Sequence, residues 1–503
     1  MRSVLSVGTI VAYASLAACS TSDQGTELRQ IPAEQPVPRP SPLAAALNLS
    51  IDVDKIMPGI KQNLDAAAVR PQAPPIGPAV GARSQLESFV NSNLKITFDD
   101  VLASKPVASR QSFSEMKTYF QNLYKNSTPT HSFTVGTQKF DCIPIRQQPS
   151  LRNSPDPIDT PPEKDNAAAG HTILGYSDYS CSTGEIPLKE TPLSEIANYQ
   201  TLRDYLSKDK GLSRRLTNEQ YKFQVPTPNA LPQIGKPQNE ETPSNDGYVH
   251  RYAVMYQSTR LNGVDAQLNL WSPQISGTDM SLSQTWIVSG SGSETETLES
   301  GWQVRDGLEK NIAVPFVYST QDNYSNTGCY NLDCAGFVQT TNQVIFARFP
   351  DDGYSVAGFA QKTLNIRWER KDGTGNWWVR MNDIWVGYYP AKLYKGDLLG
   401  AKNAPVTAEF GGENTGQAPA VQMGSGVFSS KGYGRAAFQS GLSILSSPGT
   451  WVDVIGLPYV TNPNCYSLTT TEASRPLGTR GPYFYFGGPG LSDPGCAASQ
   501  TAS

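Results

Sequence analysis

Hydrophobic and polar side chains alternate in short runs through the second half of this chain, from Tyr248 onward. A period of two is typical of a β-strand that buries one face, because successive side chains point to opposite sides. Glycine-rich turns separate the runs, as at 371–376, and no strong helical period interrupts them. The pattern predicts an all-β domain, an antiparallel β-sandwich, over residues 248–503. The clearest runs place these residues at alternate positions: Ala266, Leu268, Leu270, and then Leu364, Ile366, Trp368.

A small mixed α/β domain is predicted over residues 84–225, before the sandwich. Within it we expect a helix from Ser112 to Lys125, because Ser112 and Glu115 have the spacing of a capping box. A second helical stretch is expected from Leu193 to Tyr205. The hydrophobic residues of the first helix fall on one face: Phe113, Met116, Phe120, Leu123 and Tyr124.

The first 18 residues have the features of an export signal. Arg2 precedes an apolar stretch that is too short to cross a bilayer as a mature helix. The stretch ends in Leu16-Ala17-Ala18-Cys19, which resembles a bacterial lipobox, so Cys19 is the predicted lipidation site. The alternative is cleavage after a small residue such as Ala17, which would leave Cys19 free. Either interpretation predicts an exported protein of the cell envelope, and the first anchors it to a membrane on its periplasmic or cell-surface face.

Proline content marks two further boundaries. Residues 19–83 are rich in Pro and Ala and are expected to form an extended tether from the membrane. Residues 226–247 contain a second Pro-rich, polar run that is typical of a linker. A cut within this linker would release the first domain.

Six cysteines remain after Cys19 is set aside, and an even number in an exported chain indicates disulfides. Six cysteines allow 15 connectivities. Nearness in sequence favours pairing them in order along the chain, as Cys142 with Cys181, Cys329 with Cys334, and Cys465 with Cys496. A metal site is a weaker interpretation, because no CxxC pattern or nearby His accompanies them.

Charge and motif content exclude several functions. Lys and Arg number 41 and Asp and Glu 45, so the net charge of −4 gives no basic field for nucleic acid. Only three His occur, and the GxSxG, HExxH, P-loop and GxGxxG motifs are absent. Carboxylates remain as candidate catalysts. Glu299 and Glu413 each lie close to Gly, which lets a ligand approach the backbone, although a Glu taken alone is usually a solvated surface residue.

A series of ordered segments resembles the catalytic domain of the neprosin family. The resemblance spans about Tyr248 to Cys496, roughly half of the chain, and its segments include Glu299-Ser300-Gly301-Trp302-Gln303, Thr327-Gly328-Cys329-Tyr330, Val386-Gly387-Tyr388-Tyr389-Pro390, Phe410-Gly411-Gly412-Glu413, Gln422-Met423-Gly424 and Pro463-Asn464-Cys465-Tyr466. It implies a glutamic endopeptidase on an antiparallel β-sandwich that cuts after proline and needs no cofactor or metal. The family's two catalytic glutamates carry over to Glu299 and Glu413. The family's cysteine pairs would be Cys329 with Cys334 and Cys465 with Cys496.

The N-terminal half departs from the plant members of this family. The segment Phe140-Asp141-Cys142-Ile143-Pro144 looks like part of their activation segment, but the lipobox, the tether and most of residues 84–223 do not match. We therefore expect an activation domain, and with it a zymogen, while the route of activation stays open. One hypothesis is that the enzyme itself cuts the Pro-rich linker from Pro226 to Pro243 and so releases the first domain.

The expected mechanism is direct attack by water. Two carboxylates facing one water hold a single proton between them at acidic pH. One Glu then accepts a proton from water while the other donates to the peptide. Gln303 or Gln422 is a candidate oxyanion donor, against a purely structural hydrogen-bonding role. Trp302, Tyr388 and Tyr389 are candidates to pack on a substrate proline, against ordinary core packing.

Two other functions stay open at this point. A β-sandwich glycoside hydrolase also uses two carboxylates and aromatic platforms. A non-catalytic surface lipoprotein that binds carbohydrate or protein would carry both glutamates by chance.

Overall fold

The computed structural model describes residues 79–163, 173–176, 179–208, 249–275, 279–305, 311–396, 398, 406–416, 421–470, 475–476, 478–479 and 481–501. The predicted signal peptide, Cys19, almost all of the tether and the whole linker at 226–247 lie outside these residues. The predicted start of the first domain at residue 84 falls inside a helix that begins at Ala79.

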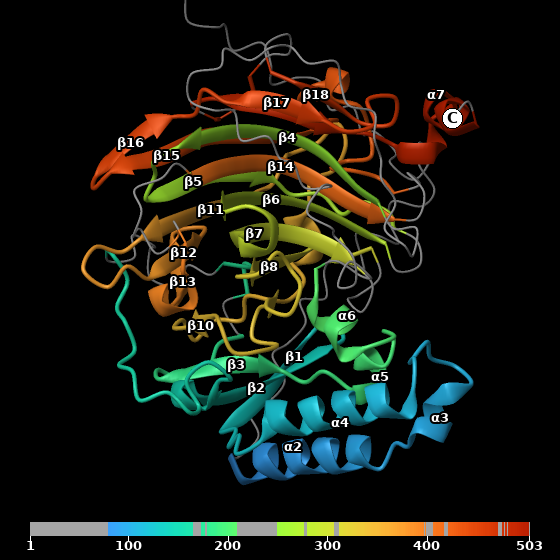
Figure 1. Cartoon of the computed structure of the whole chain (residues 1–503), viewed down its shortest axis with the longest axis vertical. Coiled ribbons are helices and arrows are strands. Elements are labelled where there is room, and N and C mark those ends of the chain that lie inside the picture. The colour runs from blue at the N-terminus through green and yellow to red at the C-terminus, as the bar shows by residue number, and fades with distance from the viewer. Residues whose placement is uncertain are drawn as a thin grey trace, which may run out of the picture. The chain divides into compact units, whose positions relative to one another are not determined.

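Helices and a small sheet make up the described residues before the linker (Figure 1). The sheet has the order β1-β2-β3 and is antiparallel. The elements are α2 (Ala79–Leu94), α3 (Phe98–Leu102), α4 (Arg110–Tyr124), β1 (His131–Val135), β2 (Gln138–Pro144), β3 (Glu185–Lys189), α5 (Leu193–Ile196) and α6 (Leu202–Leu206).

The first predicted helix is confirmed as α4, but its start is wrong. Ser109, not Ser112, is the N-cap, and its hydroxyl accepts a hydrogen bond from the Ser112 backbone N–H. The helix therefore begins three residues earlier than the capping-box pattern suggested. The five predicted hydrophobic residues are its buried residues.

The second predicted helix is two short helices, α5 and α6, separated by residues 197–201. Thr201 caps α6 in a capping box with Asp204, so the backbone starts a new helix there instead of continuing the first. This restart determines where α6 ends and where Lys208, two residues beyond it, is placed.

The described strands after the linker form two antiparallel sheets, as predicted. Sheet 1 has the order β17-β4-β14-β6-β7-β8-β9. Its strands are β4 (Val249–Thr259), β6 (Met280–Ser289), β7 (Glu296–Arg305), β8 (Val314–Ser319), β9 (Cys329–Tyr330), β14 (Val406–Gly416) and β17 (Leu457–Val460).

Sheet 2 has the order β10-β13-β12-β11-β5-β15-β19-β18, with β16 paired to β15. Its strands are β5 (Gly263–Asn269), β10 (Val338–Gln339), β11 (Thr363–Arg370), β12 (Trp377–Met381), β13 (Ile384–Tyr389), β15 (Ala437–Ser447), β16 (Thr450–Asp453), β18 (Ser467–Thr469) and β19 (Tyr483–Gly487). A last helix, α7, covers Pro494–Thr501. The two runs that predicted alternation pair with each other as β5 and β11, and their hydrophobic residues are buried.

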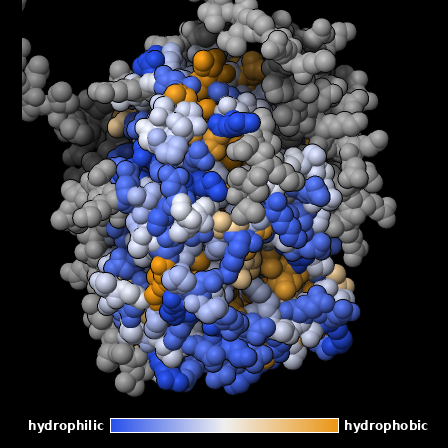
Figure 2. Space-filling view, turned by 60° about the vertical axis from the view of Figure 1, so that its left-hand side comes forward, coloured by the Kyte–Doolittle hydropathy of each residue, from blue (hydrophilic) through white to orange (hydrophobic). Residues whose placement is uncertain are grey.

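The core lies between the two sheets. The indole N–H of Trp302 on β7 donates to the backbone carbonyl of Asn269 on β5, and Gln439 on β15 donates to Ser283 on β6. We call the side of sheet 1 that makes these contacts its inner face. The surface is mostly hydrophilic on the side that Figure 2 presents, with hydrophobic residues in separate patches. Among the described residues, no helix is both long enough and apolar enough to span a membrane.

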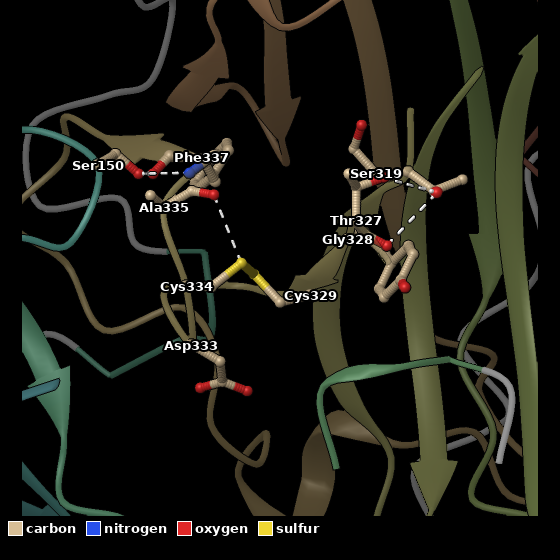
Figure 3. The surroundings of a disulfide bond; sticks show 12 residues. Ser150, Ser319, Thr327, Gly328, Cys329, Asp333, Cys334, Ala335 and Phe337 are labelled. Carbon is tan, nitrogen blue, oxygen red and sulfur yellow. Dashed lines mark hydrogen bonds between the residues drawn. A yellow bond between two sulfur atoms is a disulfide. The ribbon is translucent and has the colours of Figure 1, made fainter. Parts of the chain in front are cut away.

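The three predicted disulfides are confirmed: Cys142–Cys181, Cys329–Cys334 and Cys465–Cys496. Figure 3 shows the second, which joins β9 to the segment that leads to β10. In the same view, Ser150 from the first part of the chain donates to the backbone carbonyl of Phe337. Gln148 makes a similar link, since its amide donates to the carbonyl of Gln339 and accepts from the same residue's N–H. The first part of the chain therefore bonds directly to the edge of sheet 2.

Candidate functional site

Glu299 and Glu413 lie on two strands of sheet 1 that flank β6. On β6, Gln284 pairs with Gly411 of β14 on one side and with Gly301 of β7 on the other. Glu413 lies two residues beyond Gly411, and Glu299 two residues before Gly301. Because positions two apart on a strand share a face, all five residues face the same side. This side is opposite the inner face, and we call it the outer face of sheet 1.

The glycines of the two glutamate motifs clear space around Gln284. A Cβ on Gly301 would lie 2.0 Å from the Ser283 carbonyl oxygen and 2.8 Å from the Gln284 Cβ. A Cβ on Gly411 would lie 2.3 Å from the Ala253 carbonyl oxygen, and its backbone φ of +151° also favours glycine. Each motif, Glu-x-Gly on β7 and Gly-x-Glu on β14, therefore places a glutamate and a residue without a side chain at successive positions of the outer face.

The two carboxylates point toward each other across Gln284. Its amide nitrogen donates to Oε2 of Glu299 and to Oε2 of Glu413, each at 3.3 Å. The other oxygen of Glu299 accepts hydrogen bonds from the hydroxyls of Thr297 at 2.8 Å and Tyr324 at 2.7 Å. Glu299 and Glu413 are 0% and 2% exposed, so both carboxylates are held away from bulk water.

Glu413 has a histidine where Glu299 has hydroxyls. Nδ1 of His250, on the neighbouring strand β4, lies 2.6 Å from Oε1 of Glu413. The His250 side chain is 10% exposed. The neighbour of Glu413 can carry a positive charge, whereas the hydroxyl neighbours of Glu299 are neutral.

A lysine from the first part of the chain lies between the two carboxylates. Lys208 Nζ is 2.6 Å from Glu299 Oε2 and 2.7 Å from Glu413 Oε2, and its side chain is 2% exposed. The same nitrogen lies 5.2 Å from the ring centre of Trp286 on β6. One ammonium thus occupies the space that both carboxylates face.

Helix α6 holds Lys208 in this position. The Arg203 guanidinium donates to the backbone carbonyls of Thr327 at 2.7 Å and Gly328 at 2.9 Å. It also donates to the backbone carbonyls of Tyr324 and Asn326 and to the hydroxyl of Tyr318. The anchored loop includes Tyr324, which bonds Glu299, so the helix and the site are tied to one segment.

The charges shift several pKa values in this site. Burial raises the pKa of Glu413, but Lys208 and His250 outweigh it and lower that pKa to about 2. Burial lowers the pKa of Lys208, and the two carboxylates more than reverse this, so the ammonium stays charged. Burial, together with the charges of Glu299 and Glu413, raises the pKa of Glu409 to about 8. Glu409 is therefore neutral in acid, while Glu413 is ionised.

Two carboxylates and one amide that converge on a buried point can activate a water and polarise a carbonyl. The chemistry needs the ammonium to leave, because Lys208 fills that point.

Residues 277–489 match the model of the Neprosin family. The matched segment contains both glutamates, Gln284, the four strands β6–β9 and β14. The match supports the prediction that this chain is a glutamic peptidase. Lys208 and His250 lie before it.

Several solved structures are also similar. A crystal structure of scytalido-glutamic peptidase with a peptide-based transition-state analogue is 8% identical, with a TM-score of 0.24, and covers 47% of this chain and 96% of its own. SCP-B, a member of the eqolisin family of peptidases in complex with the tripeptide Ala-Ile-His, is 8% identical with a TM-score of 0.23 over 47% of this chain and 96% of its own. Likenesses this remote say nothing about activity.

The structure separates most of the other predicted site residues of the Neprosin segment from the pair. Gln303 does lie on the outer face, four residues from Glu299 on the same strand, and its Oε1 has no hydrogen-bond partner among the described residues. Trp302 lies on the inner face and is fully buried against sheet 2. This burial contradicts a role in packing on substrate, because Trp302 and Glu299 are three residues apart and point to opposite faces.

Tyr388, Tyr389 and Gln422 also lie apart from the two glutamates. Tyr388 packs on Trp378 within sheet 2 at 4.8 Å, and its hydroxyl accepts from the backbone of Asp159. Tyr389 is buried between Phe337 and Trp368. Gln422 accepts a hydrogen bond from the Gln274 backbone at 3.0 Å. Their contacts are those of packing and loop closure, which was the alternative for each.

Sequence reasoning missed Gln284, His250 and Lys208. The sequence did carry one signal for Gln284. It is a polar residue between Leu282 and Trp286, which lie two positions away on either side of β6 and therefore share its face. Among the described residues, His131, Cys142 and Cys181 form the one group with metal-ligand spacing, but the two sulfurs form a disulfide. No thiolate is left there to bind a metal.

Proposed function

We propose that this protein is a glutamic endopeptidase in which Glu299 and Glu413 form the catalytic pair. The observation that carries the proposal is that both Oε2 atoms face one buried point, where each contacts Lys208 and Gln284. The Neprosin match over the same strands supports it over a glycoside hydrolase or a binding lipoprotein.

The mechanism begins when Lys208 leaves and a water takes its place. Two neighbouring carboxylates then hold one proton between them in acid. The ionised Glu accepts a proton from water as the water oxygen bonds to the peptide carbonyl carbon. The protonated Glu gives its proton to the carbonyl oxygen. The Glu that took the proton of water then passes it to the amide nitrogen, and the C–N bond breaks as one hydroxyl proton returns to the other Glu and the carboxyl product forms. The Gln284 amide is the donor that stabilises the oxyanion.

A preference for proline is part of the proposal. The outer face beside Glu299 carries Trp286 and Tyr318, which pair with it across β6 and β8. An aromatic ring is a good surface for the compact, apolar proline ring. Trp286 already lies against Lys208, so a substrate that replaces the lysine would meet the same ring.

We further propose that the substrate is an extracytoplasmic peptide or protein and that a lipid on Cys19 anchors the enzyme.

We also propose that the intact chain is a latent precursor. Lys208 neutralises the pair and excludes water, while Arg203 holds α6 in place. Cutting the chain between residues 209 and 248 would free Lys208 from the strand that follows. Acid would help, because protonating a carboxylate removes half of the attraction for the ammonium.

The test is cleavage of a proline-containing peptide library between roughly pH 3 and 7, read by mass spectrometry. It uses the full chain with a site for an added protease placed in the segment 226–243. Glu299→Gln and Glu413→Gln should each lower the rate by at least about 10³-fold, because each removes a proton carrier. Glu409→Gln is the matched control, since Glu409 is buried on the same strand and is neutral in acid.

The control should stay within about threefold of the parent chain. Near-normal cleavage by either Glu299→Gln or Glu413→Gln would remove that residue from the pair. Strong inhibition by EDTA would count against a mechanism that uses carboxylates alone.

A further inference from the structure

Oxygen Oε1 distinguishes the two carboxylates of the pair. On Glu413 it lies 2.6 Å from His250 Nδ1, whereas on Glu299 it accepts from the neutral hydroxyls of Thr297 and Tyr324. Their Oε2 atoms have the same partners, Lys208 and Gln284. Once Lys208 leaves, the His250 ring is therefore the main difference between them.

His250 is well placed to act on Glu413 alone. Its ring stacks on Tyr252 of the same strand, with centroids 6.2 Å apart and planes 19° apart. Tyr252 pairs with Glu413 across β4 and β14. Among the described residues, the other charged groups that face Glu413 are Lys208, Glu299 across Gln284, and Glu409 four residues earlier on its own strand. Burial and the two neighbouring carboxylates raise the pKa of Glu409 to about 8, so it brings no charge in acid.

An imidazole is protonated below about pH 6.5 when its surroundings do not shift it. A protonated ring at this position presents both a positive charge and an N–H to Glu413 Oε1. Charge and hydrogen bond each favour the ionised carboxylate, whereas hydroxyls supply the hydrogen bonds alone. The single proton that the two glutamates share is therefore held by Glu299.

We propose that His250 is a positioning residue that keeps Glu413 ionised, which makes Glu413 the general base and Glu299 the general acid. This inference rests on the proposed function of the two glutamates. In the first step a water O–H bond breaks and its proton moves to Glu413 Oε2 as the O–C bond forms. The proton on Glu299 Oε2 moves to the carbonyl oxygen, so the pair exchanges roles without a net change of charge.

The test measures kcat/KM against pH for the activated full chain, with His250→Asn and His250→Gln as variants. Both keep an amide N–H and lose the charge. The acidic limb of the profile should move to higher pH by about one unit or more, and activity on that limb should fall about tenfold. The basic limb should stay in place, because it reports Glu299.

Tyr324→Phe is the matched comparison on the other carboxylate. It removes a hydroxyl donor from Glu299 and should move the basic limb to higher pH while the acidic limb stays. A His250 variant whose whole profile is lowered without a shift in either limb has lost a structural contact, and that result would overturn the inference. Activity that survives in Glu299→Gln or Glu413→Gln defeats the proposed function instead, so the two failures are distinguishable.

Discussion

The two faces of sheet 1 bury different chemistry, although alternate residues of the same strands build both. On β7, Trp302 and Leu298 point inward and pack against sheet 2. Glu299 lies beside Leu298 and points outward to an ammonium, an amide and two hydroxyls. The inner face gains stability from apolar burial. The outer face holds two buried carboxylates, which cost stability unless they are paired. The difference separates the residues that maintain the fold from those that we propose do the chemistry.

The largest expected effect tests this separation with two tryptophans on adjacent strands. Trp302→Ala should lower the free energy of unfolding by about 3–5 kcal/mol, because it leaves a cavity between the sheets. Trp286→Ala, on the outer face, should instead lower kcat/KM for proline peptides about tenfold and cost less stability. Denaturant unfolding and peptide kinetics on the activated chain measure the two. Reversed effects would show that the faces had been assigned the wrong way round.

Acid should weaken the outer face selectively. The pKa of Glu413 falls from its ordinary value of 4.5 to about 2 while Lys208 is in place, because Lys208 and His250 outweigh burial. A lowered carboxyl pKa stabilises the chain fully above about 4.5, and this is lost as the pH falls through about 2. The stability of the intact chain relative to Lys208→Ala should therefore shrink as the pH falls, measured by denaturant midpoints. A difference that does not change with pH would mean that the ion pair contributes nothing.

Two glutamines of the outer face, Gln284 and Gln303, can be compared as oxyanion donors. Gln284→Leu keeps the size of the side chain and removes its donor, so kcat should fall about 10²-fold with little change in KM. Gln303→Leu, on the same face, should have a smaller effect, because Gln303 contacts neither carboxylate among the described bonds. Steady-state kinetics on both variants would decide between them. A larger loss in the Gln303 variant would restore Gln303 as the oxyanion donor.

Local patterns in the sequence predicted most of the fold. Alternation at Ala266 and Leu268 predicted β5, and the one-sided spacing from Phe113 to Tyr124 predicted α4. Nearness in sequence also predicted the disulfides. The capping site was missed by three residues because Ser109 and Ser112 are both good caps. Local signals therefore predicted elements better than they predicted their ends.

The site itself depends on strand register, which no local pattern shows. Glu299 and Glu413 came from a family resemblance, while Gln284 joins them only because β6 lies between β7 and β14. Lys208 reaches them through the position of α6. The error at Trp302 was avoidable, since an odd separation from Glu299 on one strand already predicts opposite faces.

We propose above that Lys208 silences a catalytic pair of glutamates, and removing the lysine from the uncut chain tests this proposal. The intact, uncut chain carrying Lys208→Ala is assayed on the proline peptides, beside intact wild type and the double variant Lys208→Ala with Glu299→Gln. We expect cleavage by Lys208→Ala alone, with intact wild type and the double variant both silent. If intact Lys208→Ala is silent while the same chain cleaves peptide after its linker is cut, Lys208 is not what blocks the pair. Cleavage by the double variant would contradict the proposal as well.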